Sequence, residues 1–423
     1  MNHFVYRDGE LYCEDVPLRK IAEKAGTPCY VYSSATLTRH FQVFDEPFQK
    51  IDHLVCFSVK SLSNLAVLRF FASLGAGFDI VSAGELFRVE KAGGDTRKVV
   101  FSGVAKTDEE ITYALRKNIL LFNVESEAEL EAINRLAGKM GKKPRVTLRV
   151  NPDVDSHTHP HISTGLKENK FGIETEKALE LYRNWKSFKN ISMVGVDCHI
   201  GSQLLEMGPI LQALERLVEL VRQLKGMGLG IKYLDLGGGL GITYQNEVPP
   251  LPKEYAQEVI KLARDTDCTL ILEPGRVIVG NAGVLLLKVV YLKKGSVKKF
   301  VIVDAGMNAL IRPALYEAHH EILPLVKKPA QESNIADLVG PICESADFLA
   351  KDRQMPELCA GEYLAVMSAG AYGFVMASNY NSQPLPAEVL VSRDKFFVVR
   401  KRESLSQLIA GEKIPDFLRK GKK

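Results

Sequence analysis

The sequence predicts an α/β protein whose main part is a (β/α)8 barrel of the TIM type, followed by a domain rich in antiparallel strands. Three observations support this fold class. Short apolar runs recur eight times between residues 53 and 276, amphipathic segments fill the gaps between them, and after about residue 280 strand-like segments follow one another without helices. Near-continuous apolar strands separated by helices are typical of a parallel sheet that is buried on both faces. An open, doubly wound sheet is the alternative, because a count of strands does not establish closure.

The barrel strands are expected wherever a β-branched run is bounded by turn residues. Between them, the segment 210–228 places apolar residues at helical spacing and stops at glycine, as an amphipathic helix does. Together the strands and helices span roughly 225 residues, a length that suits a barrel. The expected strands cover residues 53–60, 77–83, 98–103, 119–126, 145–152, 191–201, 233–239 and 269–276.

The remainder of the chain is expected to form one β domain. Residues 284–306 are predicted to form two strands around a Lys/Gly/Ser turn, residues 388–403 form a second pair, and residues 361–367 form a further strand. The first residues, FVYRDGELYCEDVPL, are also strand-like around an Asp-Gly turn. We therefore divide the chain into N-terminal strands that join the β domain (1–30), a barrel (31–280) and an antiparallel β-barrel or sandwich domain (281–423).

Composition excludes several classes of protein. The 423 residues are 46% hydrophobic and 25% charged, which is the balance of a globular protein and not of a disordered chain or a fibre. A net charge of only +4 argues against a nucleic-acid binder. We expect no secretory signal, no membrane helix and a cytoplasmic location. The seven scattered cysteines contain no CxxC pair, so we expect reduced thiols and no zinc site.

Polar residues interrupt the apolar strands at their carboxyl ends. In a (β/α)8 barrel these ends surround one mouth, where active sites lie. The pattern therefore predicts an active site, with candidates Lys60, Asp79, Ser102, Arg149, His199, Gly237 to Gly239, Glu273 and Arg276.

Lys60 ends the apolar strand LVCFSVK. Desolvation at an apolar barrel mouth disfavours the charged amine, so we expect a lowered pKa and a nucleophile able to form a Schiff base with a carbonyl. The alternative is a strand-end lysine that reaches into solvent.

Two turns and two histidine segments each allow more than one interpretation. The GGGLG run at 237–241 predicts either an anion-binding turn or simply a tight βα turn. In EPGR, Glu273 and Arg276 either serve a ligand or form a pair that closes the barrel. His199 either lies flat against an aromatic ligand or is a core histidine. HTHPHI (157–162) has no Cys or carboxylate cluster beside it, so we expect no metal there.

These motifs together resemble the diaminopimelate decarboxylases, a family of the fold-type III pyridoxal phosphate (PLP) enzymes that also include alanine racemase and ornithine decarboxylase. FSVKSL (57–62) corresponds to the usual YAVKAN, and FDIVSAGEL, HIGSQ, the glycine turn and EPGR match the wider superfamily. Residues 149–173 and GPICESAD (340–347) resemble the diaminopimelate enzymes specifically, and AGAYGF (369–374) and MNALIRPALY (307–316) extend the match.

The resemblance implies decarboxylation of meso-2,6-diaminopimelate to L-lysine and carbon dioxide, the last step of lysine biosynthesis, through a PLP Schiff base on Lys60 and reprotonation of the resulting carbanion by Cys343. It implies that Glu273 keeps the ring nitrogen protonated and that His199 stacks on the ring. The remaining cofactor contacts that it implies are Asp79, Ser202, Gly238, Gly239, Gly275, Arg276 and Tyr372. The substrate contacts that it implies are Arg276, Arg312, Tyr316, Glu344 and Tyr372.

The resemblance also implies a homodimer in which Cys343 and Glu344 complete the partner's site. Two alternatives remain: a decarboxylase of ornithine, arginine or a related diamino acid, and a catalytically silent paralogue that binds partners. The Arg312 and Glu344 pair argues against the first, since those substrates lack a distal carboxylate. Lys60, Glu273 and Cys343 argue against the second.

Overall fold

The computed structural model describes residues 2–154, 170–328 and 334–419. Eight parallel strands form a closed barrel, because each strand pairs with the next along the chain, including β8 with β9, and the last strand, β13, pairs with the first, β5. Closure confirms the predicted barrel and excludes the open sheet. The barrel strands are β5 (His53–Ser58), β6 (Gly77–Ile80), β7 (Val99–Phe101), β8 (Leu121–Val124), β9 (Arg145–Asn151), β11 (Ser192–Asp197), β12 (Tyr233–Asp235) and β13 (Thr269–Leu272). The two-residue strand β10 (Ile173–Glu174) pairs with β9 outside the closed ring.

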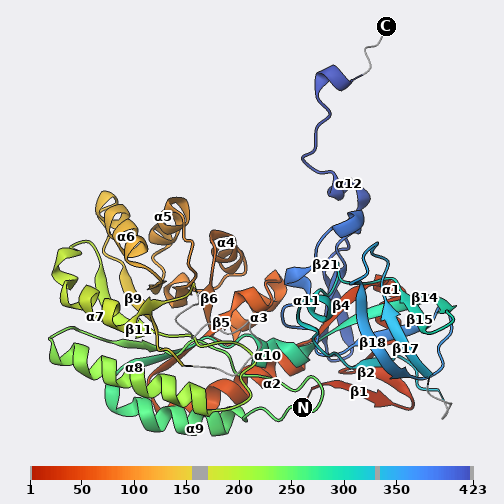
Figure 1. Cartoon of the computed structure of the whole chain (residues 1–423), viewed down its shortest axis with the longest axis horizontal. Helices are drawn as coiled ribbons and strands as arrows, with labels where there is room; N and C mark the ends of the chain where they lie inside the picture. Colours follow the sequence, from red (N-terminus) through yellow and green to blue (C-terminus); the bar gives the residue numbers. More distant parts are fainter. Residues whose placement is uncertain (1, 155–169, 329–333, 420–423) are drawn as a thin grey trace.

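Several helices around the barrel begin where short polar side chains satisfy the first free backbone amides. Ser82 caps α4, Ser126 caps α6, and Thr107 forms a capping box with Glu110 at the start of α5. Figure 1 shows these helices on the outside of the barrel. The helices are α2 (Ser34–Asp45), α3 (Leu65–Ser73), α4 (Ala83–Lys91), α5 (Asp108–Lys117), α6 (Glu127–Lys139), α7 (Thr175–Arg183), α8 (Gly208–Gly226), α9 (Pro252–Ala263) and α10 (Arg276–Val279).

The barrel interior changes from apolar to polar along its axis. Cys56, Val100, Leu121 and Ile271 form a small buried cluster of their own. Because side chains alternate along a strand, the residue two positions further on faces the same interior. Those positions are polar on the same strands: Ser58, Ser102, Asn123 and Glu273. The strand sequences therefore build an apolar layer inside the barrel, with a layer of polar side chains nearer the mouth. We call this second layer, together with the buried carboxyl groups beside it, the polar floor.

The second half of the fold is a nine-stranded sheet in the order β18-β17-β15-β14-β4-β20-β21, with β19 pairing both β14 and β16. Most pairs are antiparallel; β15–β17 and β4–β20 are parallel. This sheet confirms the predicted β domain. Its strands are β4 (Cys29–Ser33), β14 (Gly283–Lys294), β15 (Lys299–Val303), β16 (Ile322–Pro324), β17 (Asn334–Val339), β18 (Phe348–Met355), β19 (Tyr363–Val366), β20 (Ala387–Ser392) and β21 (Lys395–Arg400).

The N-terminal strands join this half of the molecule in two ways. Strand β4 lies between β14 and β20 in the large sheet. The strands β1 (Phe4–Arg7), β2 (Glu10–Cys13) and β3 (Val16–Pro17) form a separate three-stranded sheet, followed by α1 (Leu18–Ala25). That sheet shares a buried core with β14 and β20, and the Leu11 amide donates to the Leu325 carbonyl at 2.8 Å.

Besides α1, two short helices of the described residues lie outside the barrel, α11 (Arg312–Tyr316) and α12 (Leu405–Leu408). After β21 the chain leaves the body of the molecule, as Figure 1 shows. Several apolar side chains of this C-terminal segment are exposed, among them Leu405 at 73% and Phe417 at 83%. Within the described ranges, the helices are too short or too polar to span a bilayer.

Candidate active site

Lys60 lies just beyond strand β5, in a 3-10 turn formed by Val59–Ser61. Its Nζ donates to Oδ2 of Asp79 at 2.8 Å, and the Ser58 hydroxyl donates to the same oxygen. The Lys60 side chain is 32% exposed, whereas Asp79 is fully buried. Oδ1 of Asp79 is buried without a hydrogen-bond partner among the described residues. The lysine is therefore held at the barrel mouth by a carboxylate that retains one free oxygen.

This environment corrects the expected pKa of Lys60. Desolvation lowers it, as the sequence suggests, but the nearby carboxylates of Asp79 and Glu273 outweigh that effect and raise the pKa above its usual value. In this structure the amine is therefore a cation held by carboxylates and not a neutral nucleophile.

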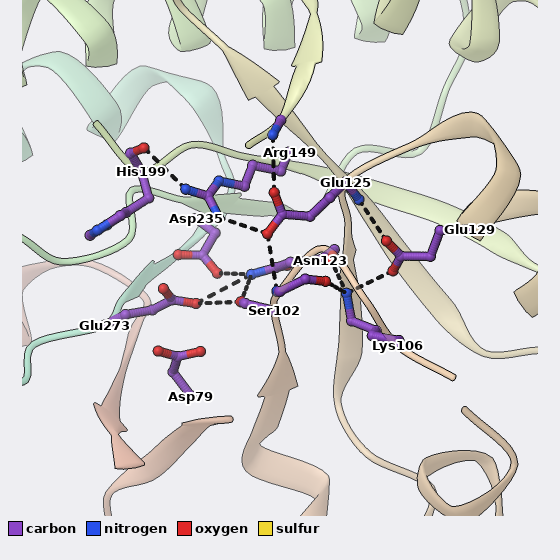
Figure 2. Close-up of polar contacts among 12 residues, drawn as sticks. Asp79, Ser102, Lys106, Asn123, Glu125, Glu129, Arg149, His199, Asp235 and Glu273 are labelled. Atoms are coloured by element: carbon purple, nitrogen blue, oxygen red, sulfur yellow. Dashed lines mark hydrogen bonds and ion pairs between the residues drawn. The ribbon is translucent and has the colours of Figure 1, made fainter. Parts of the chain in front are cut away.

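Glu273 follows strand β13 and is 5% exposed. Its Oε1 accepts hydrogen bonds from Nδ2 of Asn123 at 3.2 Å and from the Ser102 hydroxyl at 3.4 Å. The same Nδ2 also donates to Oδ2 of Asp235 at 3.0 Å, and the Thr147 hydroxyl donates to Oδ1 of Asn123 at 2.5 Å. Figure 2 shows Ser102, Asp235 and Glu273 gathered around the Asn123 amide. One buried amide thus fixes two buried carboxyl groups.

The polar floor gathers more carboxyl groups than there are cations to pair with them. Burial raises the pKa of Asp235 to about 8, with the Asp197 carboxylate contributing. Burial also raises the pKa of Asp197 and of Glu273 well above their usual values, and neighbouring carboxylates add to the effect in both. Asp197 Oδ1 is buried and without a hydrogen-bond partner in the described part of the chain. A cationic or proton-bearing ligand at this floor would relieve the repulsion.

A buried ion pair forms one wall above the floor. Nη1 of Arg149 lies 2.7 Å from Oε1 of Glu125, and Nη2 donates to the His199 carbonyl at 3.3 Å. Beside it, Lys106 pairs with Glu129 at 2.7 Å (Figure 2). Arg149, a candidate from its strand-end position, is therefore paired with a carboxylate and anchors the loop that carries His199.

His199 lies two residues beyond the end of β11, and its ring is fixed by the glycine turn. The Gly238 amide donates to Nδ1 at 3.1 Å, so Nε2 carries the proton of a neutral imidazole. Burial, Arg149 and Lys60 all lower the pKa of His199 well below its usual value. A neutral aromatic ring is therefore presented at the cavity.

The glycines of the turn are required by close packing. A Cβ at Gly238 would collide with the Glu273 carbonyl, and Gly239 has a φ of +114°. Gly275, two residues after Glu273, is packed against Ser58 and Ser61. The amides of Gly237 and Gly238 already donate to Asp235 and His199. The packing therefore supports the interpretation of these glycines as a tight βα turn. Anion binding by Gly238 and Gly239 stays a prediction.

A cavity of about 350 Å³ opens above the floor. It is lined by seven residues predicted from the sequence: Lys60, His199, Ser202, Arg276, Arg312, Tyr316 and Tyr372. Five further lining residues were not predicted: Gln203, Tyr244, Glu247, Ala318 and His319. Gln203 belongs to HIGSQ itself, and the other four lie within six residues of the GGGLG run or of RPALY; that proximity was the available signal.

Two buried arginines dominate the cavity wall. Arg276 donates to the Ser202 hydroxyl at 3.0 Å and to the Tyr244 hydroxyl at 2.7 Å, and its guanidinium lies 5.0 Å from the centre of the Tyr372 ring. Arg312 lies 4.5 Å from the centre of the Tyr244 ring. Arg276 and Arg312 are only 7% and 6% exposed, respectively. The wall is therefore a site for an anion.

Tyr372 connects the two halves of the fold at this cavity. Its φ of +54° lies in the left-handed region, and its amide donates to the Ser61 carbonyl at 2.9 Å. The β domain thus contributes a side chain beside Lys60.

Cys343 and Glu344 lie elsewhere in the single chain. They are exposed on the loop between β17 and β18, and they are not among the residues that line the cavity. The Cys343 amide donates to Asn381 at 2.7 Å, and the Tyr380 hydroxyl donates to Glu344 at 3.1 Å. One chain therefore does not bring them to Lys60.

The histidines at 157, 159 and 161 lie outside the described residues. In the part of the chain that is described, no group of three His, Cys, Asp or Glu side chains is arranged to hold a metal ion.

Comparison with known proteins assigns the family. The model of the pyridoxal-dependent decarboxylase, pyridoxal binding domain, matches residues 34–280. The diaminopimelate decarboxylase of Haemophilus influenzae is 54% identical over 97% of this chain and 99% of its own length. The chain belongs to the diaminopimelate decarboxylase family.

Solved structures of this family superpose closely. Diaminopimelate decarboxylase from M. jannaschii, in complex with L-lysine, matches with a TM-score of 0.94 and 38% identity over 99% of this chain and 100% of that one. The Helicobacter pylori enzyme, also complexed with L-lysine, matches with a TM-score of 0.90 and 42% identity over 93% of this chain and 98% of that one.

The residues present fit the pyridoxal phosphate cofactor of this family. Lys60 offers an amine at the mouth, His199 offers a neutral ring face, and Glu273 offers a buried carboxyl group that needs a proton-bearing partner. The strongest observation is the surplus of buried carboxyl groups at the floor, which a pyridinium nitrogen would offset.

Proposed function

We propose that this chain decarboxylates meso-2,6-diaminopimelate to L-lysine and carbon dioxide with pyridoxal phosphate, as the last step of lysine biosynthesis in the cytoplasm. One observation carries the choice of substrate: Arg276 and Arg312, both buried, share one cavity with Lys60. Their hydrogen-bond partners Ser202, Tyr244 and His320 are all neutral, so the guanidinium charges stay available to a ligand anion. Diaminopimelate brings a second carboxylate, whereas ornithine and arginine do not.

Lys60, Asp79, His199 and Glu273 would hold the cofactor ring. When bound, the cofactor supplies a protonated ring that stabilises the carbanion left by the loss of carbon dioxide. Glu273 would accept a hydrogen bond from the protonated ring nitrogen, and the low-dielectric floor would strengthen that bond. Asn123 keeps the Glu273 carboxylate in place.

The phosphate contacts are assigned to residues around the mouth. Ser202 and Tyr372 would offer hydroxyl groups, and the backbone at Gly239, Gly275 and Arg276 would offer amides. Gly238, whose amide bonds His199, would allow the phosphate to approach the turn closely. Backbone amides and hydroxyls are suitable donors for a phosphate.

The substrate's far end is assigned to the arginine wall. The planar forks of Arg276 and Arg312 match a carboxylate in two-point hydrogen bonding, with Tyr316 and Tyr372 beside them. Glu344 would pair with the distal ammonium. Cys343 would donate a proton to the α-carbon of the substrate after that carbon has lost carbon dioxide.

The last two roles require a second copy of the chain. Cys343 and Glu344 are exposed in one subunit and absent from its cavity wall, which supports a homodimer whose loop reaches the partner's mouth. The exposed apolar residues of the C-terminal segment, such as Leu405 and Ile409, also support a contact with another chain.

Subunit sharing is tested by mixing two inactive variants. We expect Lys60→Ala and Cys343→Ala to be inactive alone. Random reassortment of equal amounts should restore roughly a quarter of wild-type sites, because half of the dimers then hold one intact site of two. Confirmed subunit exchange without regained activity would show that Cys343 acts within its own chain or not at all.

The substrate is tested by a panel. Purified protein with added pyridoxal phosphate is given meso-diaminopimelate, L-lysine, L-ornithine and L-arginine, and carbon dioxide release is measured. We expect rapid release from diaminopimelate alone. Preferential release from ornithine or arginine would replace the substrate assignment, and no release from any of them would support the silent paralogue.

A further inference from the structure

His320 directly contacts the Arg312 guanidinium. Its Nε2 lies 3.0 Å from Nη1 of Arg312, and its ring packs edge-on against Tyr244 with centres 5.3 Å apart. The His320 side chain is fully buried and does not line the cavity. It therefore lies behind Arg312, on the side away from a ligand.

The ring of His320 is held in one tautomer. Its Nδ1 lies 2.8 Å from the Met367 carbonyl, which can only accept, so Nδ1 carries the proton. Nε2 is then a lone pair that accepts from Arg312. Nη1 of Arg353 also donates to the His320 carbonyl at 2.9 Å, which fixes the backbone at this residue.

The charge of this acceptor matters for the ligand. Burial and the neighbouring Arg312 lower the pKa of His320 to about 3, so the ring is neutral at any physiological pH. A carboxylate in the same place would neutralise Arg312 and compete with the carboxylate of a substrate. An apolar residue would leave a buried N–H donor unsatisfied, which costs free energy. A neutral acceptor avoids both outcomes.

We propose that His320 is a positioning residue for the distal carboxylate: its neutral Nε2 holds the Arg312 fork in the cavity wall without neutralising its charge. Tyr244 completes this support, with its ring face under Arg312 and its hydroxyl bonded to Arg276. This inference rests on the proposed function, and it deepens the account of how the substrate's far end is recognised.

The chain offers a matched pair of variants. In His320→Gln, the amide oxygen can reach the position of Nε2 and accept from Arg312. In His320→Asn, the shorter amide reaches only the position of Nδ1, so the contact with Met367 is kept and the acceptor is lost. Both remain polar and neutral; the glutamine keeps the acceptor for Arg312 and gives up the contact with Met367, and the asparagine does the reverse.

The test measures binding by calorimetry to the holoenzyme, with two probes. L-lysine has a carboxylate for Arg312, whereas 1,5-diaminopentane has the two amines and no carboxylate. We expect His320→Asn to weaken L-lysine binding about tenfold, equivalent to about 1.4 kcal/mol, and to leave diaminopentane binding unchanged. KM for diaminopimelate should rise by a similar factor, with kcat changed less than threefold. His320→Gln should recover most of the L-lysine affinity.

Three results would overturn the proposal: wild-type affinity for L-lysine in His320→Asn, equal loss of both probes, or no recovery in His320→Gln. If His320→Asn does not fold, His320→Gln alone decides the test. This variant retains the acceptor, so a tenfold loss of its L-lysine affinity would contradict the positioning role of His320. A wild-type enzyme that does not decarboxylate diaminopimelate would contradict the proposed function instead. Normal turnover with unchanged L-lysine affinity in His320→Asn would contradict only the role of His320.

Discussion

Replacing Glu273 by glutamine should move catalysis and stability in opposite directions. The substitution keeps the size of the side chain, and the amide oxygen can still accept from Asn123 and Ser102, which now bond Oε1. The other oxygen becomes an N–H donor, where the proposed role needs an acceptor for a protonated ring nitrogen. Removing one partner of a buried charge pair typically costs about 3–5 kcal/mol. We therefore expect kcat to fall at least 100-fold.

The same change should stabilise the protein without cofactor. Burial and the neighbouring carboxylates of Asp235 and Asp79 raise the pKa of Glu273 well above its usual 4.5, so ionising this group costs more free energy in the folded barrel than in the unfolded chain. Glutamine does not ionise, so the cofactor-free variant should unfold at a higher urea concentration than the wild-type protein at pH 7.

Two assays and one control test this reasoning. Cofactor occupancy is checked by absorbance before kcat is measured, and urea unfolding is followed on the cofactor-free protein. Asp197→Asn is the control, because it removes another buried carboxyl group from the same barrel and should stabilise the cofactor-free protein with a much smaller loss of kcat. Near-normal kcat in fully loaded Glu273→Gln, or a less stable cofactor-free variant, would refute the assigned role.

Four further expectations follow from the same geometry. Borohydride reduction of the holoenzyme and peptide mass mapping should find the pyridoxyl group on Lys60; a label on another lysine would contradict its role. Arg312→Ala should raise KM for diaminopimelate about tenfold or more, since a hydrogen bond to a charged group is worth about 1.5–3 kcal/mol; an unchanged KM would indicate another substrate. The pKa of Asp235 is raised from 3.8 to about 8, so this group keeps a proton in the folded protein at pH values where it loses that proton in the unfolded chain. The free energy of unfolding of the cofactor-free protein should therefore fall between pH 4 and pH 8, and a higher urea midpoint at pH 8 than at pH 5 would contradict this. Gly238→Ala should lower the melting temperature, because its Cβ would collide with the Glu273 carbonyl; an unchanged melting temperature would argue against the tight packing.

The barrel could be predicted because its signal is local. Apolar strands and capped helices alternate along the chain, and polar residues such as Asp79 and Glu273 interrupt the strands at the positions that face one mouth. The sequence favoured closure over the open sheet but could not establish it, since closure depends on the pairing of β5 with β13, whose residues are distant in sequence.

The charge state of Lys60 was predicted with the wrong sign for a related reason. Burial can be inferred from an apolar strand, but the carboxylates of Asp79 and Glu273 meet the amine only in the folded barrel. His320 and Tyr244 escaped prediction because their importance comes from contacts with Arg312 and Arg276, not from a recognisable motif. The cavity could be predicted in outline, and the groups that support it could not.

The central claim is that this chain removes carbon dioxide from one end of diaminopimelate and binds the carboxylate at the other end. The most direct measurement is a turnover in D2O with the holoenzyme, followed by mass spectrometry of the amino acid product. The account predicts L-lysine in equal amount to the carbon dioxide released, with one deuterium bound to the carbon that lost it. Product without lysine, or lysine without a carbon-bound deuterium, would contradict it.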